Sequence, residues 1–182
     1  MPPEVDDLRT ALNLPQWPEG VARIELGGRT VEVMAAPGHQ PAHLIFYDDR
    51  TALLFTGDFL LPGRLMVDDL DAYRASARRL VSFLGDRPVA HVLGAHIELD
   101  NAGELFSSGS TSHPNERALA LDKADVLALP AALDDFNGFY ARHDHFVITN
   151  PKRNLLTLVV GVVLLIGGIV GGWLRMRRRK KS

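Results

Sequence analysis

Residues 36–49 read APGHQPAHLIFYDD and place a Pro-Gly-His turn directly before an apolar strand. Two further stretches end apolar strands in a similar way: residues 53–63, LLFTGDFLLPG, pass through Thr-Gly-Asp, and residues 89–98, VAHVLGAHIE, pass through Gly-Ala-His. In each stretch a glycine beside the polar residue lets the backbone bend sharply and aim a side chain off the strand end. The sequence therefore predicts three polar side chains that converge on one point, His39, Asp58 and His96.

Cysteine is absent from the 182 residues, which excludes disulfide frameworks, thiol catalysis and zinc sites built on thiolates. The hydrophobic share of 46% and the charged share of 23% are typical of a globular protein. A metal must then be held by His, Asp or Glu, and that set suits Zn²⁺, Mn²⁺ or Fe, with Asp58 able to bridge two ions. No Gly-rich phosphate loop is present.

Residues 155–174, LLTLVVGVVLLIGGIVGGWL, contain no charged side chain over 20 residues. As a helix this stretch is about 30 Å long, the thickness of the hydrocarbon core of a bilayer. All 22 acidic residues precede it together with only 14 of the 20 basic residues, so residues 1–154 carry a net charge of −8 and the RMRRRKKS tail carries +6. We expect a single-pass membrane protein with an acidic head, which excludes nucleic acid as a partner.

The basic tail predicts the orientation of the anchor, because positive charge favours the cytoplasmic side. The tail is then cytoplasmic and the head is outside, in the periplasm or the extracellular space. Residues 1–20 lack the basic and apolar regions of an export signal, so this orientation requires a signal on a preceding segment. Insertion by the tail with a cytosolic head is the open alternative. Four glycines at small-xxx-small spacing predict a homodimer through the membrane helix: Gly167, Gly168, Gly171 and Gly172.

The head has the pattern of an α/β domain. Period-two alternation and short apolar runs predict strands at 21–26, 30–35, 43–47, 51–56, 89–93 and 146–149. Apolar stripes predict helices at 69–84 and at 122–139, the second kinked or restarted at Pro130. Residues 101–115, rich in Ser and Gly, read as an exposed loop. The expected domain order is lead-in 1–20, folded domain 21–150, linker 151–154, transmembrane helix 155–174 and basic tail 175–182.

The order of these motifs resembles the C-terminal part of the metallo-β-lactamase fold over about residues 21–128. The resemblance implies the second half of an αββα sandwich, here an α/β (α+β) partial domain followed by one transmembrane helix. By that likeness His39 would be a ligand of a first metal, Asp58 the bridging carboxylate and His96 a ligand of a second, with one or two zinc ions in the intact enzyme. The likeness also places three residues beside the site or at its rim: His43, Glu98 and Glu116.

The sequence departs from the family pattern at its opening signature, His-x-His-x-Asp-His, which should precede His39. Residues 1–38 contain no histidine. Each ion is left with one imidazole and the shared Asp58, where a catalytic zinc keeps at least three protein ligands. The Arg-His-Asp-His run at 142–145 comes in the wrong order and is interpreted as a solvated segment before the membrane. His91 and His113 are interpreted as incidental.

Two functions remain open from the sequence. In the first, the chain is the C-terminal portion of a membrane-anchored metallo-hydrolase that cleaves an ester, thioester or amide of a small molecule, and is inactive by itself. In the second, the chain is a complete, non-catalytic anchored half-domain or pseudoenzyme that acts through a protein partner on its uncovered sheet.

Overall fold

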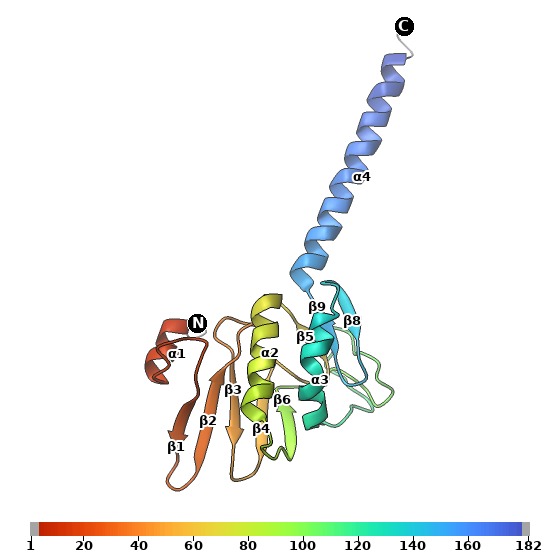
Figure 1. Ribbon diagram of the computed structural model, residues 1–182. Coiled ribbons are helices and arrows are strands. Elements are labelled where there is room, and N and C mark those ends of the chain that lie inside the picture. Colours follow the sequence, from red (N-terminus) through yellow and green to blue (C-terminus); the bar gives the residue numbers. More distant parts are fainter. Residues whose placement is uncertain (1–3, 180–182) are drawn as a thin grey trace.

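A computed structural model describes the backbone of residues 4–179 and the side-chain surroundings of residues 4–169. It has a head of sheet and helices, from which one long helix leaves (Figure 1). The strands are β1 Ala22–Glu25, β2 Thr30–Ala35, β3 Leu44–Asp48, β4 Leu53–Gly57, β5 Arg64–Met66, β6 His91–Gly94, β7 Ala120–Leu121, β8 Tyr140–Arg142 and β9 Val147–Thr149. The helices are α1 Val5–Ala11, α2 Leu70–Leu84, α3 Lys123–Asp134 and α4 Pro151–Arg179.

The main sheet places two strand ends side by side. Its strand order is β1-β2-β3-β4-β6-β7, with an antiparallel meander from β1 to β4 and a parallel pair of β4 and β6. A parallel pair requires a long crossover, and α2 supplies it. Because Gly57 at the end of β4 pairs with Gly94 at the end of β6, the residues after both strands emerge at one edge of the sheet.

Helices α2 and α3 cover one face of this sheet and form the main core with it (Figure 1). Asp69 begins α2 as its N-cap, since its side chain accepts a hydrogen bond of 3.0 Å from the Ala72 amide. The core consists of fully buried apolar side chains from strands and helices, among them Leu54, Val92, Tyr73, Leu80 and Leu129. On the opposite face a smaller cluster surrounds Leu14, Ala22 and Val33, and Phe55 stays 39% exposed.

A second sheet of three short strands, in the order β5-β9-β8, lies where α4 begins (Figure 1). β5 pairs in parallel with β9, and β9 pairs antiparallel with β8. The chain passes from β9 through Asn150 into α4. The Asn150 side chain caps this helix, because it accepts a hydrogen bond of 2.9 Å from the Arg153 amide in the first turn. The stretch Pro151–Ile169 has a mean hydropathy of 1.7 and is wholly unburied, so its length and composition allow a bilayer crossing.

The predicted α/β fold class is confirmed, and several boundaries differ. α3 runs without a break through Pro130 and ends at Asp134 rather than near 139. Residues 151–154, expected to be a linker, form the first turn of α4. Strands β5, β7 and β8 were not predicted, because each has only two or three residues, too few to show a recognisable alternation. β5 and β7 also form by pairing with segments far away in the chain. Gly171 and Gly172 lie outside the residues whose side chains are described, so the glycine-mediated dimer stays a prediction.

Candidate metal centre

The Pro-Gly-His turn is held against α2 by a close approach that only glycine allows. Gly38 has φ +141°, and a Cβ there would lie 2.5 Å from Tyr73 Cα. The Gly38 carbonyl accepts hydrogen bonds from the amides of Asp68 and Asp69, each at 2.9 Å. This fixes His39, which is 8% exposed, in a position where its Nδ1 lies 3.0 Å from the Met66 carbonyl oxygen.

The Thr-Gly-Asp turn places Asp58 beside His39. Gly57 has φ +55°, which ends β4 and turns the next residue off the strand edge. His43 lies next to this glycine, and its Nε2 is 3.0 Å from the carbonyl oxygen of Thr56. Burial lowers the pKa of the His43 imidazole. A neutral His43 therefore donates to this carbonyl and fixes the turn that carries Asp58.

The Gly-Ala-His turn brings His96 to the same edge from β6. At Gly94 a Cβ would lie 2.4 Å from Leu61 Cβ, so β6 ends in direct contact with the segment after β4. The amide of Ala95 donates to the Gly57 carbonyl at 3.1 Å. His96 is thereby set across from Asp58, with its side chain 47% exposed.

The three predicted residues converge, and Asp58 stands at their centre. Its Oδ2 lies 3.6 Å from His39 Nε2 and its Oδ1 lies 3.4 Å from His96 Nδ1. Neither contact has the geometry of a hydrogen bond, and Oδ1 is buried without a hydrogen-bond partner. A buried carboxylate oxygen without a donor is costly unless a cation or another donor faces it. Each oxygen of Asp58 is thus directed at a different imidazole.

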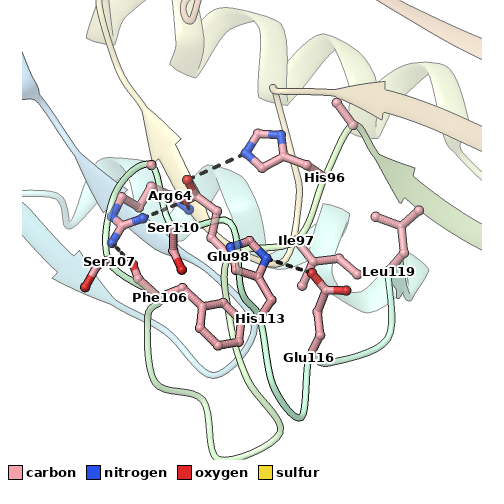
Figure 2. Close-up of a pocket in the computed structure, with 12 residues that line it drawn as sticks. Arg64, His96, Ile97, Glu98, Phe106, Ser107, Ser110, His113, Glu116 and Leu119 are labelled. Atoms are coloured by element: carbon pink, nitrogen blue, oxygen red, sulfur yellow. Dashed lines mark hydrogen bonds and ion pairs between the residues drawn. The ribbon is translucent and has the colours of Figure 1, made fainter.

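Glu98 connects His96 to the strand β5. Its Oε1 lies 3.6 Å from His96 Nε2, while its Oε2 accepts a hydrogen bond of 2.6 Å from the Arg64 amide. The Arg64 guanidinium lies 3.2 Å from the same Oε2 and also donates to the Phe106 carbonyl at 2.6 Å. Figure 2 shows this contact between Glu98 and His96. Glu98 therefore faces one ring nitrogen of His96, and Asp58 faces the other.

A pocket of about 410 Å³ opens beside His96 and Glu98 (Figure 2). One wall is a stack of Phe106 on His113, with ring centroids 4.3 Å apart and an interplanar angle of 1°. His113 Nδ1 lies 3.0 Å from Glu116 Oε1, which places Glu116 at the rim of the pocket. The interpretation of His113 as incidental is therefore wrong, because its ring forms part of the pocket wall. The sequence Ser-His-Pro-Asn-Glu at 112–116, with a His three residues before a Glu, could have indicated this contact.

The other histidine candidates lie apart from this centre. His145 Nδ1 is 2.8 Å from Asp125 Oδ1, so the 142–145 segment is tied to α3 rather than free in solvent as predicted. His143 packs on Phe146 with ring centroids 4.9 Å apart. His91 lies exposed at the start of β6, at the opposite end of that strand from His96.

Imidazole nitrogens and a carboxylate suit a borderline divalent metal such as Zn²⁺. Metal-binding histidines usually bond one ring nitrogen to a carbonyl or carboxylate, and His39 Nδ1 faces the Met66 carbonyl in this way, which leaves Nε2 for a metal. Asp58 Oδ1 has no hydrogen-bond partner and can serve as a ligand atom. Within residues 4–169, no three His, Asp or Glu side chains gather closely enough to hold an ion by themselves. The residues present fit a metal centre in their chemistry, and each ion needs further donors.

Comparison with known proteins gives the same family as the resemblance in the sequence. The family model of the metallo-beta-lactamase superfamily matches residues 5–129. The acyl-coenzyme A thioesterase MBLAC2 of Gallus gallus is 29% identical over 91 residues, which are 48% of this chain and 33% of that protein. The chain thus spans about a third of the length of this curated relative.

Two solved structures are similar to this chain at lower identity. A metallo-beta-lactamase from Pontibacter korlensis is 14% identical, with a TM-score of 0.42 over 64% of this chain and 47% of that one. An archaeal metallo-beta-lactamase superfamily protein from Sulfolobus tokodaii is 18% identical, with a TM-score of 0.42 over 69% of this chain and 42% of that one. With more than half of its length matched by the family model, this chain belongs to the metallo-β-lactamase superfamily.

Proposed function

We propose that this chain is the membrane-anchored part of a metal-dependent hydrolase that cleaves an acyl ester or thioester. The observation that carries the proposal is the placement of Asp58, whose two oxygens face imidazoles from two different strand ends. The buried Oδ1, which has no hydrogen-bond donor, supports a cation at this point. The thioesterase activity in the name of the Gallus gallus relative supports the choice of an acyl substrate.

His39 and Asp58 would hold one ion, and Asp58 and His96 the second. A divalent metal held there would supply Lewis acidity toward a carbonyl oxygen and would lower the pKa of a bound water. The remaining work belongs to the chain itself. The Met66 carbonyl holds the His39 ring so that Nε2 faces Asp58, and Glu98 holds His96 from its other side. The pocket beside His96 has room for part of a substrate.

The missing ligands are proposed to come from a segment that carries the family signature His-x-His-x-Asp-His. Residues 1–38 contain no histidine, and two protein ligands per ion fall short of the three that a catalytic zinc keeps. It follows that residues 1–182 alone bind metal weakly and do not hydrolyse a substrate.

Helix α4 is proposed as a single membrane span, with the basic tail in the cytoplasm and the head outside. The unburied apolar stretch from Pro151 to Ile169 supports the span. The concentration of basic residues after residue 174 supports the orientation. Pairing of two such helices is proposed with it, from the small-xxx-small spacing in the sequence of Gly167 with Gly171 and of Gly168 with Gly172.

Cobalt binding tests the proposal, because Co²⁺ occupies zinc sites and its visible absorption reports nitrogen and oxygen ligands. The full chain in detergent micelles is titrated with Co²⁺ as wild type, as Asp58→Asn and as Asp49→Asn. Asp49 is an exposed carboxylate in the β3–β4 turn and serves as the matched control. Because this chain supplies only two protein ligands per ion, we expect a weak band that appears at high Co²⁺ concentration in the wild type and in Asp49→Asn, and its loss in Asp58→Asn.

The protein isolated from its native membranes provides the second half of the test. Its intact mass, zinc content and hydrolysis of acyl thioesters are measured together. Bound zinc, a signature-bearing segment or partner, and thioester hydrolysis that EDTA removes are the expected results. Equal cobalt binding by wild type and Asp58→Asn, or a native protein that contains the signature and no metal, would contradict the proposal.

A non-catalytic half-domain is the second candidate. It is favoured by Phe55, which stays 39% exposed on the sheet face opposite α2 and α3, where a partner polypeptide could pack. In this case the native protein has a mass of 20.0 kDa, no metal and a bound partner. A metal-free native monomer counts against the pairing.

A further inference from the structure

The candidate metal centre lies at the end of the head from which α4 leaves. In Figure 1 the turns of the β1–β2 and β3–β4 hairpins are at the opposite end from α4, and β6 points away from them. Because β4 and β6 are parallel, Asp58 and His96 follow strand ends that both face away from those turns. The centre is therefore on the α4 side of the sheet.

Two short connections join His39 to the base of α4. Met66, whose carbonyl lies 3.0 Å from His39 Nδ1, pairs in register with Thr149 of β9, and α4 starts two residues later. Asp68, whose amide donates to the Gly38 carbonyl, also accepts a hydrogen bond of 2.7 Å from the Lys152 ammonium in the first turn of α4.

The base of α4 is also fixed to the hairpin of β8 and β9. The Arg153 guanidinium lies over the Phe139 ring, 4.5 Å from its centroid. The Asn154 side-chain amide donates to the Phe139 carbonyl at 3.1 Å. These contacts hold the first turn of α4 in a fixed orientation relative to the head. One particular surface of the head therefore lies beside the start of the helix.

That surface is apolar and aromatic. Tyr140, Thr149 and Met66 form one row across β8, β9 and β5, and directly paired residues project on the same side of a sheet. Tyr140 is 48% exposed, Met66 40% and the neighbouring Phe139 37%. We call the three exposed residues Tyr140, Met66 and Phe139 the juxtamembrane row. Exposed aromatic side chains next to the start of a membrane helix, with cations beside them, are typical of the headgroup region of a bilayer.

We propose that the juxtamembrane row lies in the lipid headgroup layer and that the metal centre therefore takes an acyl-chain amphiphile from the membrane surface. The occupant of this surface is the bilayer that holds α4, because the row is continuous with the start of that helix. The substrate class rests on the proposed function, since it assumes a hydrolase at Asp58. The lipid contact of the row rests only on α4 as a span.

The absence of cysteine makes the contact directly measurable, because a single introduced cysteine is the only thiol to react with a label. The full chain is prepared as Tyr140→Cys, Met66→Cys and the control Asp49→Cys. Each variant carries a bimane label and is reconstituted in phosphatidylcholine vesicles with and without doxyl-labelled lipid. We expect strong quenching by doxyl lipid at positions 140 and 66 and none at 49. Equal quenching at all three positions, or none at 140 and 66, would overturn the lipid contact.

The substrate class is tested with the native protein in the same vesicles. Thioesters with one headgroup and acyl chains of 4 or 16 carbons are compared at equal total concentration. We expect hydrolysis of the long chain to be faster by about tenfold or more, because it partitions into the bilayer beside the site. A Tyr140→Asp variant should lose this preference through a higher KM for the long chain, with its rate on the short chain kept.

The outcomes separate the two proposals. Equal rates on both chain lengths would overturn the amphiphile while the hydrolase stands. Hydrolysis of neither would overturn the hydrolase and its substrate class together, and the quenching profile would still decide the lipid contact.

Discussion

Replacing Gly94 by alanine tests whether the end of β6 is positioned by direct backbone contact. A Cβ at this position would meet Leu61 Cβ at 2.4 Å, Leu61 Cα at 2.8 Å and the Leu60 carbonyl oxygen at 3.0 Å. Carbon atoms in contact normally lie about 3.5–4.0 Å apart, so β6 must move by about 1 Å. The neighbouring atoms belong to the backbone or lie next to it, so a change of rotamer cannot relieve the overlap.

The expected loss of stability follows from two opposing effects. Overpacking of a well-packed core costs about 1–3 kcal/mol, and the upper end applies where the overlap is with backbone. Alanine also lowers the conformational entropy of the unfolded chain, which stabilises the folded state by about 0.4–1 kcal/mol. The net loss is about 2 kcal/mol, which for a chain of this size lowers Tm by about 4–8 °C.

Thermal unfolding of the full chain in detergent, followed by circular dichroism, measures this change. Gly161→Ala is the matched control, because a Cβ there would have nothing within 4 Å and alanine favours the helix. Cobalt titration should show weaker binding by Gly94→Ala, since His96 moves with β6 and a displacement of about 1 Å is costly at a functional site. An unchanged Tm together with unchanged cobalt affinity would refute the reasoning.

Two further predictions concern buried polar groups. The Arg29 guanidinium lowers the pKa of Asp48 to about 2, so its stabilisation is complete above about pH 4 and is lost as pH falls toward 2. Asp48→Asn should therefore lower Tm at pH 6, and the difference from wild type should shrink between pH 4 and 2; the same behaviour in exposed Asp49→Asn would contradict the assignment. Tyr73→Phe leaves the Phe59 carbonyl without its donor and should cost about 1–3 kcal/mol in urea unfolding at pH 7; a loss below about 0.5 kcal/mol would contradict it.

The three turns that meet at the candidate centre could be predicted from the sequence because each is a local feature. A glycine, a neighbouring polar residue and an adjacent apolar run are enough to indicate a strand end that presents a side chain, as at His39, Asp58 and His96. The α/β class of the head followed from the same short-range patterns. The apolar composition of residues 155–174 likewise indicated a long helix without reference to any partner.

The surroundings of those three side chains could not be predicted, because they depend on pairs far apart in the chain. Glu98 meets Arg64 across 34 residues, and Lys152 meets Asp68 across 84. The 3-residue strand β5 has no recognisable pattern of its own and exists because β9 pairs with it. Such contacts form only after the intervening chain has folded and brought both partners together.

The sequence by itself determined which residues turn off strand ends, where the chain is apolar enough to span a bilayer, and that any metal must use His and carboxylate ligands. Only the tertiary structure decided that Asp58 lies between two imidazoles and that Phe106 and His113 wall a pocket beside them. It alone joined the base of α4 to the turn that carries His39. The physical reason is that backbone preference and hydropathy act over a few residues, whereas the position of one strand end against another is set by packing of the whole core.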